Sequence, residues 1–184
     1  VFNARERDWQ INEVVVDNDQ STGKSKFKKP RKRNDEDKGF VYSEFIQGTT
    51  NPFQEGTAIQ FDSRNKPNVA TYIPDFPEAG EYGVYVSYAK GDGPVTYRVT
   101  HSGGVTDFRV DQRMGYGTWI YLDKFYFNAG KDKKAAKVEL IAPEGEEKTF
   151  SADAVRFGGG IGNIARNGRA GGLARYFEGA RYNL

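Results

Sequence analysis

The sequence has 184 residues, of which 14% are aromatic, and its net charge at pH 7 is +2. It contains no cysteine and a single histidine, His101, which excludes disulfides, cysteine-based zinc sites and multi-histidine zinc sites. The nearly balanced charge gives no general reason to expect a nucleic-acid partner, and no apolar run approaches the ~20 residues that a membrane-spanning helix needs. The chain starts at Val1, and we interpret it as a piece of a longer or processed protein.

The first sixty residues predict short strands around a charged insertion. Residues 14–16 are a run of valines, and further strand signals fall in residues 40–46 and 58–61. The segment 21–38 shows no apolar periodicity, and seven of the ten residues from Lys24 to Arg33 are basic. We therefore expect a charged loop insertion over residues 21–38.

The clearest strand pattern lies in residues 69–110. An apolar run over residues 69–73 stops at Pro74, which lacks a backbone donor. Residues 82–88 alternate with a period of two, so one set of side chains faces the core and the other faces away from it. Two more alternating runs, at 95–99 and 105–110, flank a glycine-rich turn and predict a hairpin.

Strand signals continue to residue 157, in residues 119–127, 138–141 and 152–157. Many short strands without helical patterns between them predict an all-β, antiparallel β-sandwich over residues 1–157. Residues 158–184 are rich in Gly and Arg, and we expect a linker or docking segment that contains a short helix near residues 173–182.

Several short motifs in residues 69–157 lie at a specific spacing. They are A-T-Y-I-P-D-F-P-E-A-G-E-Y at 70–82, V-Y-V-S-Y at 84–88, F-N-A-G at 127–130 and A-D-A-V-R-F at 152–157. Through these motifs the chain resembles the golvesin C-terminal-like domain, also called the xanthan lyase carbohydrate-binding-like domain. Residues 14–62 look like the opening strands of that family, with the charged insertion added.

The resemblance implies a galactose-binding-like jelly roll attached to exported bacterial enzymes that act on polysaccharide or peptidoglycan. The glycines at 158–160 are also similar to the segment that leads into cell-wall amidase domains in some family members. The parent protein would then be xanthan-lyase-like or an N-acetylmuramoyl-L-alanine amidase, and its location would be secreted, periplasmic or at the cell surface. The family pattern supplies no catalytic residues.

Four residues are candidates for binding sugar, because the apolar face of a pyranose packs on an aromatic ring. Tyr116 lies in a Gly-Tyr-Gly loop where core burial is not expected, and Arg113 nearby could supply hydrogen bonds. Trp119 is a second aromatic candidate, but it matches the family pattern and a place in the core is the alternative. Tyr85 lies on the face of its strand opposite Tyr82. A buried or plain surface role is the alternative for each.

Other features allow two interpretations each. The basic run 24–33 could bind a polyanion, whereas a solvated loop neutralised by the acidic residues 35–37 is the interpretation we favour. His101 beside a glycine-rich turn suggests backbone hydrogen bonding rather than catalysis. We expect no cofactor, although a structural calcium ion stays open.

These observations favour a non-catalytic module that binds carbohydrate or cell wall, with polysaccharide or peptidoglycan as its partner. A structural module that packs against an adjacent domain of the same parent protein and binds no glycan is the first alternative. A small polysaccharide lyase or hydrolase is the second. An exposed aromatic platform would support binding, and complete burial of the aromatic rings would support the structural module.

Overall fold

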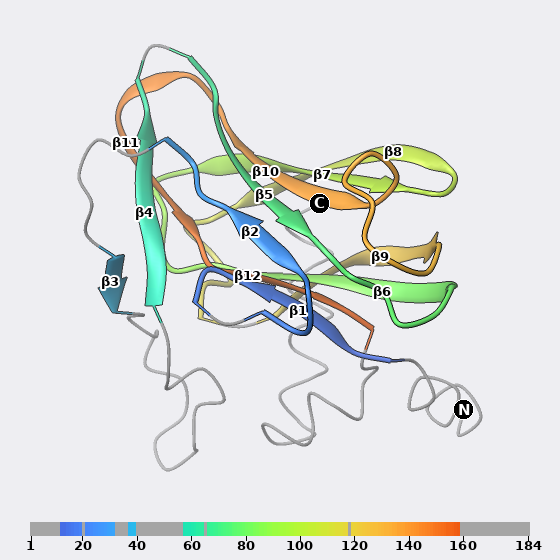
Figure 1. Cartoon of the computed structure of the whole chain (residues 1–184). Coiled ribbons are helices and arrows are strands. Elements are labelled where there is room, and N and C mark those ends of the chain that lie inside the picture. Colours follow the sequence, from blue (N-terminus) through green and yellow to red (C-terminus); the bar gives the residue numbers. More distant parts are fainter. Residues whose placement is uncertain are drawn as a thin grey trace.

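The computed structural model describes residues 12–19, 21–31, 37–39, 57–64, 66–117 and 119–158. Within these ranges every regular element is a β-strand (Figure 1). The strands are β1 (Val14–Asp17), β2 (Lys26–Lys28), β3 (Asp37–Gly39), β4 (Thr57–Ser63), β5 (Asn68–Ile73), β6 (Gly80–Ser87), β7 (Pro94–His101), β8 (Gly104–Asp111), β9 (Ile120–Phe127), β10 (Lys137–Ala142), β11 (Gly145–Ala152) and β12 (Ala154–Phe157). All pairings between these strands are antiparallel, as the sequence predicts.

Three sheets build this part of the chain. One has the strand order β1-β12-β6-β9, the second β2-β5-β10-β7-β8 and the third β11-β4-β3. In Figure 1 the four-stranded and five-stranded sheets lie one above the other as two layers, and the third sheet stands at one side. The chain passes from the third sheet into the four-stranded sheet at Asp153, between β11 and β12. The fold is the jelly-roll-like β-sandwich that the sequence predicts.

The alternation in β6 shows how the sequence builds the core. Tyr82, Val84 and Val86 point between the two layers, and none of them is more than 1% exposed. Complete burial of such a side chain contributes about 1.5–3 kcal/mol to folding. Tyr85, between them in sequence, lies on the opposite face of the sheet.

Aromatic rings fill the centre of the sandwich. Phe76, in the proline-rich connection between β5 and β6, stacks on Phe127 at 4.7 Å between ring centroids and meets the edge of Phe157 at 5.3 Å. Tyr82 lies 4.6 Å from the same Phe76 ring. Each such pair adds about 0.5–1.5 kcal/mol beyond the burial of its area. The connection between β5 and β6, which contains two prolines, therefore also places an aromatic ring, Phe76, at the centre of the core.

The charged segment 21–38 differs from the expected loop, because it contains β2 and β3. β2 forms because Phe27 packs on Tyr72, with 5.0 Å between the ring centroids. Lys26 and Lys28 on either side are exposed, and charged side chains on an edge strand disfavour pairing with other chains. The sequence reasoning also missed β11, whose adjacent charged residues Glu146 and Glu147 hide any alternation.

Two expected elements lie outside the described residues. They are the strand at 40–46 and the short helix near 173–182, together with the rest of the Gly/Arg-rich segment after Gly158. Among the residues that are described, no helix long and apolar enough to cross a membrane is found.

Candidate functional site

Tyr85 and Trp119, two of the residues predicted to bind sugar, share Arg156 as a neighbour. The guanidinium carbon of Arg156 lies 4.0 Å from the ring centroid of Tyr85 and 5.6 Å from that of Trp119. Sheet register creates this contact, because Arg156 of β12 is opposite Tyr85 of β6. Tyr85 is 5% exposed and Arg156 is 3% exposed. The two aromatic rings thus surround a buried arginine, and Tyr85 does not present its face to solvent.

Arg113 and Tyr116 lie on the loop between β8 and β9. The Arg113 guanidinium is exposed, but it pairs with the Asp111 carboxylate at 2.5 Å and holds the pKa of that carboxyl below its usual value. Tyr116 is half-buried and packs against the core. The main chain of this loop is held by Tyr88, which follows β6: the Tyr88 hydroxyl donates to the Met114 carbonyl at 2.7 Å, and the Gly117 N–H donates to the Tyr88 carbonyl at 3.0 Å. Sugar binding by these four residues stays a prediction.

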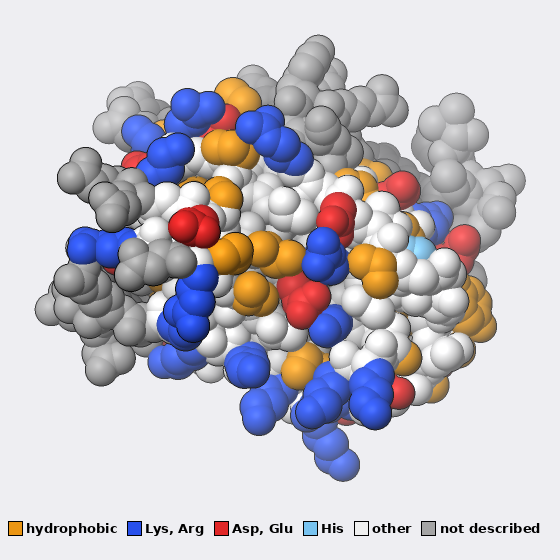
Figure 2. Space-filling view, turned by 90° about the horizontal axis from the view of Figure 1, so that it is seen from above, with side chains coloured by type: hydrophobic (Ala, Val, Ile, Leu, Met, Phe, Trp, Pro, Cys, Tyr) orange, Lys and Arg blue, Asp and Glu red, His pale blue; other side chains and the backbone are white. Residues whose placement is uncertain are grey.

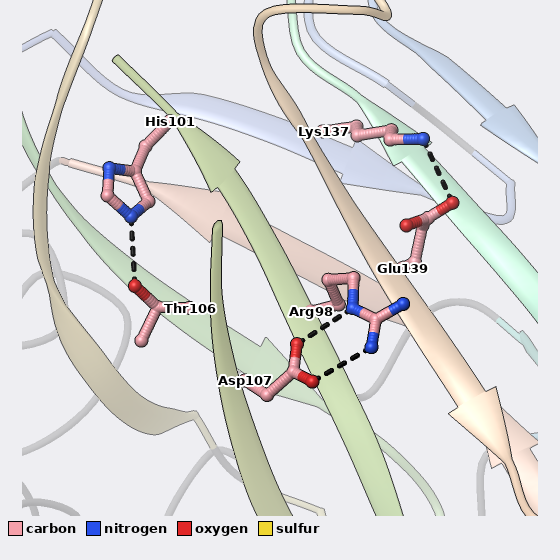
Figure 3. Close-up of polar contacts among 6 residues, drawn as sticks. All are labelled: Arg98, His101, Thr106, Asp107, Lys137 and Glu139. Carbon is pink, nitrogen blue, oxygen red and sulfur yellow. Dashed lines mark hydrogen bonds and ion pairs between the residues drawn. The ribbon is translucent and has the colours of Figure 1, made fainter. Parts of the chain in front are cut away.

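His101 takes the structural role that the sequence suggests. Its Nδ1 accepts a hydrogen bond from the Gly103 backbone N–H at 3.1 Å, and its Nε2 lies 2.9 Å from the Thr106 hydroxyl (Figure 3). The ring stacks on Phe125 at 4.2 Å. Desolvation lowers the pKa of His101 and so favours the neutral form of the ring. Both ring nitrogens therefore serve the hairpin turn between β7 and β8.

Few large apolar side chains in the described part of the chain are exposed. They are Val105, Met114 and Tyr126, so Tyr126 is the one exposed aromatic ring among them. A flat row of rings, on which the faces of successive sugar units could stack, is not formed by the described residues.

The outer face of the five-stranded sheet carries polar and charged groups in ordered rows. The register places Lys28 of β2 beside Thr71 of β5, and Thr71 beside Glu139 of β10. Glu139 in turn lies beside Arg98 of β7, which is paired with Asp107 of β8. Because side chains alternate across a sheet, all five members of this row face the same side. The row therefore runs across the whole sheet.

A hollow of about 430 Å³ lies at the β2 end of this face. Its lining residues are Lys26, Lys28, Thr71, Ile73, Lys133, Lys137 and Glu139. Figure 2 looks down on this face and shows lysine and arginine side chains gathered along its lower border. We call this feature the lysine hollow. Strands β2, β5 and β10 and the turn before β10 supply its walls.

Next to the hollow, the charge of Arg98 is neutralised within the sheet. Arg98 donates two hydrogen bonds to Asp107, at 2.8 and 2.9 Å, and these hold the pKa of Asp107 below its usual value (Figure 3). Inside the hollow, the Lys137 ammonium lies 3.0 Å from the Glu139 carboxylate. Lys26, Lys28 and Lys133 form no ion pair with any described residue. Three lysines of this face that lack an ion pair therefore lie together in the hollow.

Sequence reasoning found only part of the lysine hollow. Lys26 and Lys28 belong to the basic run 24–33, but Lys133, Lys137 and Glu139 were not singled out. The available signal was alternation, since Lys26-Phe27-Lys28 and Lys137-Val138-Glu139 each place charged side chains on one face of a strand. Which strands are neighbours is a property of the fold, and the sequence does not reveal it.

Within the described ranges, no group of three or more His, Cys, Asp or Glu side chains is arranged to hold a metal ion. The structural calcium ion left open by the sequence stays a prediction.

Comparison with known proteins gives matches that agree with this fold. A stretch of 92 residues is 34% identical to xanthan lyase from Bacillus sp. (strain GL1), covering 47% of this chain and 10% of that protein. The solved structure of Paenibacillus xanthan lyase matches 79% of this chain and 13% of its own, with a TM-score of 0.56 and 24% identity. A family 35 carbohydrate binding module from Clostridium thermocellum aligns over 79% of this chain and 97% of its own, with a TM-score of 0.45 and 12% identity.

The chain spans about a tenth of the length of the curated relative that it matches. The match to the xanthan lyase structure supports the sandwich fold. The model of the golvesin C-terminal domain family matches residues 36–159, which is most of the chain. This match includes the motifs at 70–82, 84–88, 127–130 and 152–157. The chain therefore belongs to the golvesin C-terminal domain family.

Proposed function

We propose that this domain is a non-catalytic module that binds polysaccharide and holds a polysaccharide-active parent protein at its substrate. The observation that carries the proposal is the lysine hollow, about 430 Å³ in volume, on the outer face of the five-stranded sheet. Its size falls within the ~300–1,000 Å³ of typical ligand sites. Its mixed lining suits a sugar, because Thr71 offers a hydroxyl, Ile73 an apolar surface and the lysines several donors.

The proposal that the module is non-catalytic is supported by the way in which the described ionisable groups are paired. Arg98 pairs with Asp107, Lys137 pairs with Glu139, and His101 is held by its own turn. General acid–base chemistry needs such groups to converge on one reacting atom. Arg98, Asp107, Lys137 and Glu139 are instead paired along the sheet, and the His101 ring is held in its turn.

The biological setting is also part of the proposal. The curated relative carries the name xanthan lyase, so we propose an enzyme that acts on polysaccharide or peptidoglycan as the parent protein. Large polymers are met outside the cell, which favours a secreted, periplasmic or cell-surface protein. A tethered module raises the local concentration of substrate, and millimolar affinity, about −4 kcal/mol, is sufficient for this purpose.

A second candidate function is that of a structural module that positions a neighbouring domain. It is favoured by the burial of Tyr85 and Arg156, which lie on the outer face of the four-stranded sheet but are 5% and 3% exposed. Such a module would present no free sugar-stacking surface and would not be retained by any glycan.

Affinity gel electrophoresis tests the two candidates, because it detects millimolar binding. The full chain is run through gels that contain peptidoglycan fragments, neutral polysaccharides or acidic polysaccharides. Retardation by at least one polymer is expected. Tyr116→Ala should be retarded equally, since the hollow and not the β8–β9 loop makes the contact. Unretarded migration in every gel would contradict the proposal and support the structural module. Loss of retardation in a folded Tyr116→Ala variant would move the site to the loop.

A further inference from the structure

We propose that the lysine hollow selects acidic polysaccharides, with Lys26, Lys28 and Lys133 binding the carboxylate groups of successive sugar units. This inference rests on the proposed function and adds the chemical class of the polymer.

The local charge of the hollow is its first distinguishing feature. Four lysines and one glutamate line it, which leaves an excess of three positive charges among seven residues. The whole chain of 184 residues has a net charge of only +2. The hollow therefore has a local excess of positive charge that the nearly balanced composition of the whole chain does not reveal. Such a concentration attracts anionic ligands and repels cationic ones.

The second feature is the availability of this charge. Glu139 is paired with Lys137, so the pair is close to neutral. Within the described part of the chain, Lys26, Lys28 and Lys133 make no ion pair, and all three are exposed. Lys131, by contrast, donates to the Lys24 carbonyl at 2.8 Å. Three ammonium groups thus remain for a ligand.

The third feature is the rigid placement of the lysines. β2 is paired with β5 and anchored by Phe27, whose ring lies 5.0 Å from that of Tyr72. Because Phe27 points inward, Lys26 and Lys28 must point outward. Lys133 lies in a turn closed by a hydrogen bond from the Ala136 N–H to the Asp132 carbonyl, at 2.8 Å. A fixed array loses less entropy on binding than a mobile loop would.

The spacing of the array suits a polymer with repeated charges. Alternate residues of a strand lie about 6.6 Å apart, and adjacent strands about 4.8 Å apart. Lysine ammonium groups act as point charges and do not demand the paired geometry that an arginine fork does. The hollow can therefore accept carboxylates in several orientations along a chain of sugars.

Nucleic acid fits the same hollow less well. Single-stranded nucleic acid gains about 1–3 kcal/mol per base by stacking on aromatic rings. None of the residues that line the hollow is aromatic. The apolar Ile73 and the hydroxyl of Thr71 match a sugar ring better than a base. Acidic polysaccharide is therefore the polyanion that the lining favours.

The experiment compares polygalacturonate with its carboxyl-reduced derivative, which has the same chain without charge. The full chain, a hollow variant and a control variant are run in affinity gels that contain each polymer. The hollow variant is Lys26→Gln, Lys28→Gln and Lys133→Gln. The control variant is Lys90→Gln, Lys124→Gln and Lys148→Gln, which removes the same charge from exposed lysines elsewhere. Thermal unfolding confirms that both variants are folded.

We expect the wild-type chain and the control variant to bind polygalacturonate, and to bind its carboxyl-reduced derivative only weakly. An exposed ion pair contributes about 0.2–1 kcal/mol, or up to about fivefold in affinity, so the loss of three should weaken binding of the acidic polymer by roughly 3-fold to 100-fold. Added salt should weaken binding of the wild type, because screening acts within about 10 Å at 0.1 M. Glu139→Gln should strengthen binding, since it removes the one negative charge of the lining.

The other outcomes separate this inference from the proposed function. Equal binding of both polymers would overturn the selectivity and leave the polysaccharide module intact. No binding to these or any other glycan would overturn both. An equal loss in the two triple variants would show that the hollow is not the site. Equally tight binding of single-stranded DNA at the same salt concentration would show a general polyanion surface and overturn the assignment to polysaccharide.

Discussion

Arg156 lies over the ring of Tyr85, with its guanidinium carbon 4.0 Å from the ring centroid, on the outer face of the four-stranded sheet. The next ring along the row is Tyr121, 5.2 Å from Tyr85, and the Glu13 carboxylate lies 3.7 Å from the guanidinium. The arginine is 3% exposed, so its charge interacts with these groups in a region of low dielectric. We infer that Arg156 stabilises the fold and is not a contact for soluble ligands.

Replacing Arg156 by lysine should lower stability while leaving the fold intact. Lysine keeps the charge but loses the planar group that stacks on Tyr85, and such a contact is worth about 0.5–2 kcal/mol when it is desolvated. In a domain of this size, each kcal/mol lowers Tm by roughly 2–4 °C. Thermal unfolding followed by circular dichroism measures the loss. Tyr85→Phe, which keeps the ring, is the matched control and should change Tm less than Arg156→Lys does.

The carboxyl group of Asp153 makes stability depend on pH. Burial raises the pKa of Asp153 to about 8, and the charge of Asp17 acts in the same direction. Asp19, Tyr72 and Tyr97 also interact with this carboxyl group, and the nearby Ser87 hydroxyl partly opposes the shift of the pKa. The folded state therefore holds a proton that the unfolded chain releases at about pH 4.

Because the pKa is raised on folding, the stabilisation is complete below about pH 4 and is lost as the pH rises to about 8. The slope is at most about 1.4 kcal/mol per pH unit. Asp153→Asn keeps the shape and cannot ionise, so its stability should exceed that of the wild type at pH 8 by a few kcal/mol. Chemical unfolding at pH values from 4 to 9 measures both proteins. Parallel pH profiles for the two would contradict the burial of an ionisable Asp153.

Gly91 packs so closely against Gln112 that there is no room for a side chain at position 91. A Cβ atom on Gly91 would lie 2.4 Å from Gln112 Oε1 and 2.9 Å from its Cβ. Gln112 is fully buried and makes two hydrogen bonds to the Ser151 backbone, both at 2.8 Å. Gly91→Ala should therefore displace Gln112 and cost about 1–3 kcal/mol, which is the usual cost of overpacking.

Gly93 provides the matched control for Gly91. A Cβ atom there would meet no other atom within 4 Å, although both glycines are buried in the same turn. Gly93→Ala should therefore leave the free energy of unfolding close to that of the wild type. Urea unfolding of the two variants is the measurement. Similar losses in both would show that backbone freedom, and not contact with Gln112, explains the need for glycine.

The sequence predicted the parts of the fold that follow from local alternation. The period-two pattern in residues 82–88 identifies which face of β6 is buried, and the runs at 95–99 and 105–110 became the hairpin of β7 and β8. β11 was not predicted, because its first half is a glycine followed by three charged residues. Its pairing with β4 is also irregular between Gly145 and Thr149. Pattern reasoning has no signal for a strand of this kind.

The candidate site was predictable only in part, since it depends on contacts between distant segments. The basic run in the sequence indicated Lys26 and Lys28. Lys133 and Lys137 lie near them only because β5 pairs with both β2 and β10, and the sequence does not show this pairing. Tyr85 and Trp119 were identified as rings that could bind sugar. The register of β6 with β12 places the buried Arg156 against Tyr85, and this register cannot be read from either strand alone.

Backbone amide shifts in an assigned NMR spectrum, recorded while an oligogalacturonate is titrated into the full chain, would locate the binding surface. We predict that the largest shifts fall in β2, β5, β10 and the turn before β10, and that they are absent from the hollow variant. Shifts centred on the loop that contains Arg113 and Tyr116, or no shifts at millimolar oligosaccharide, would contradict binding at the lysine hollow.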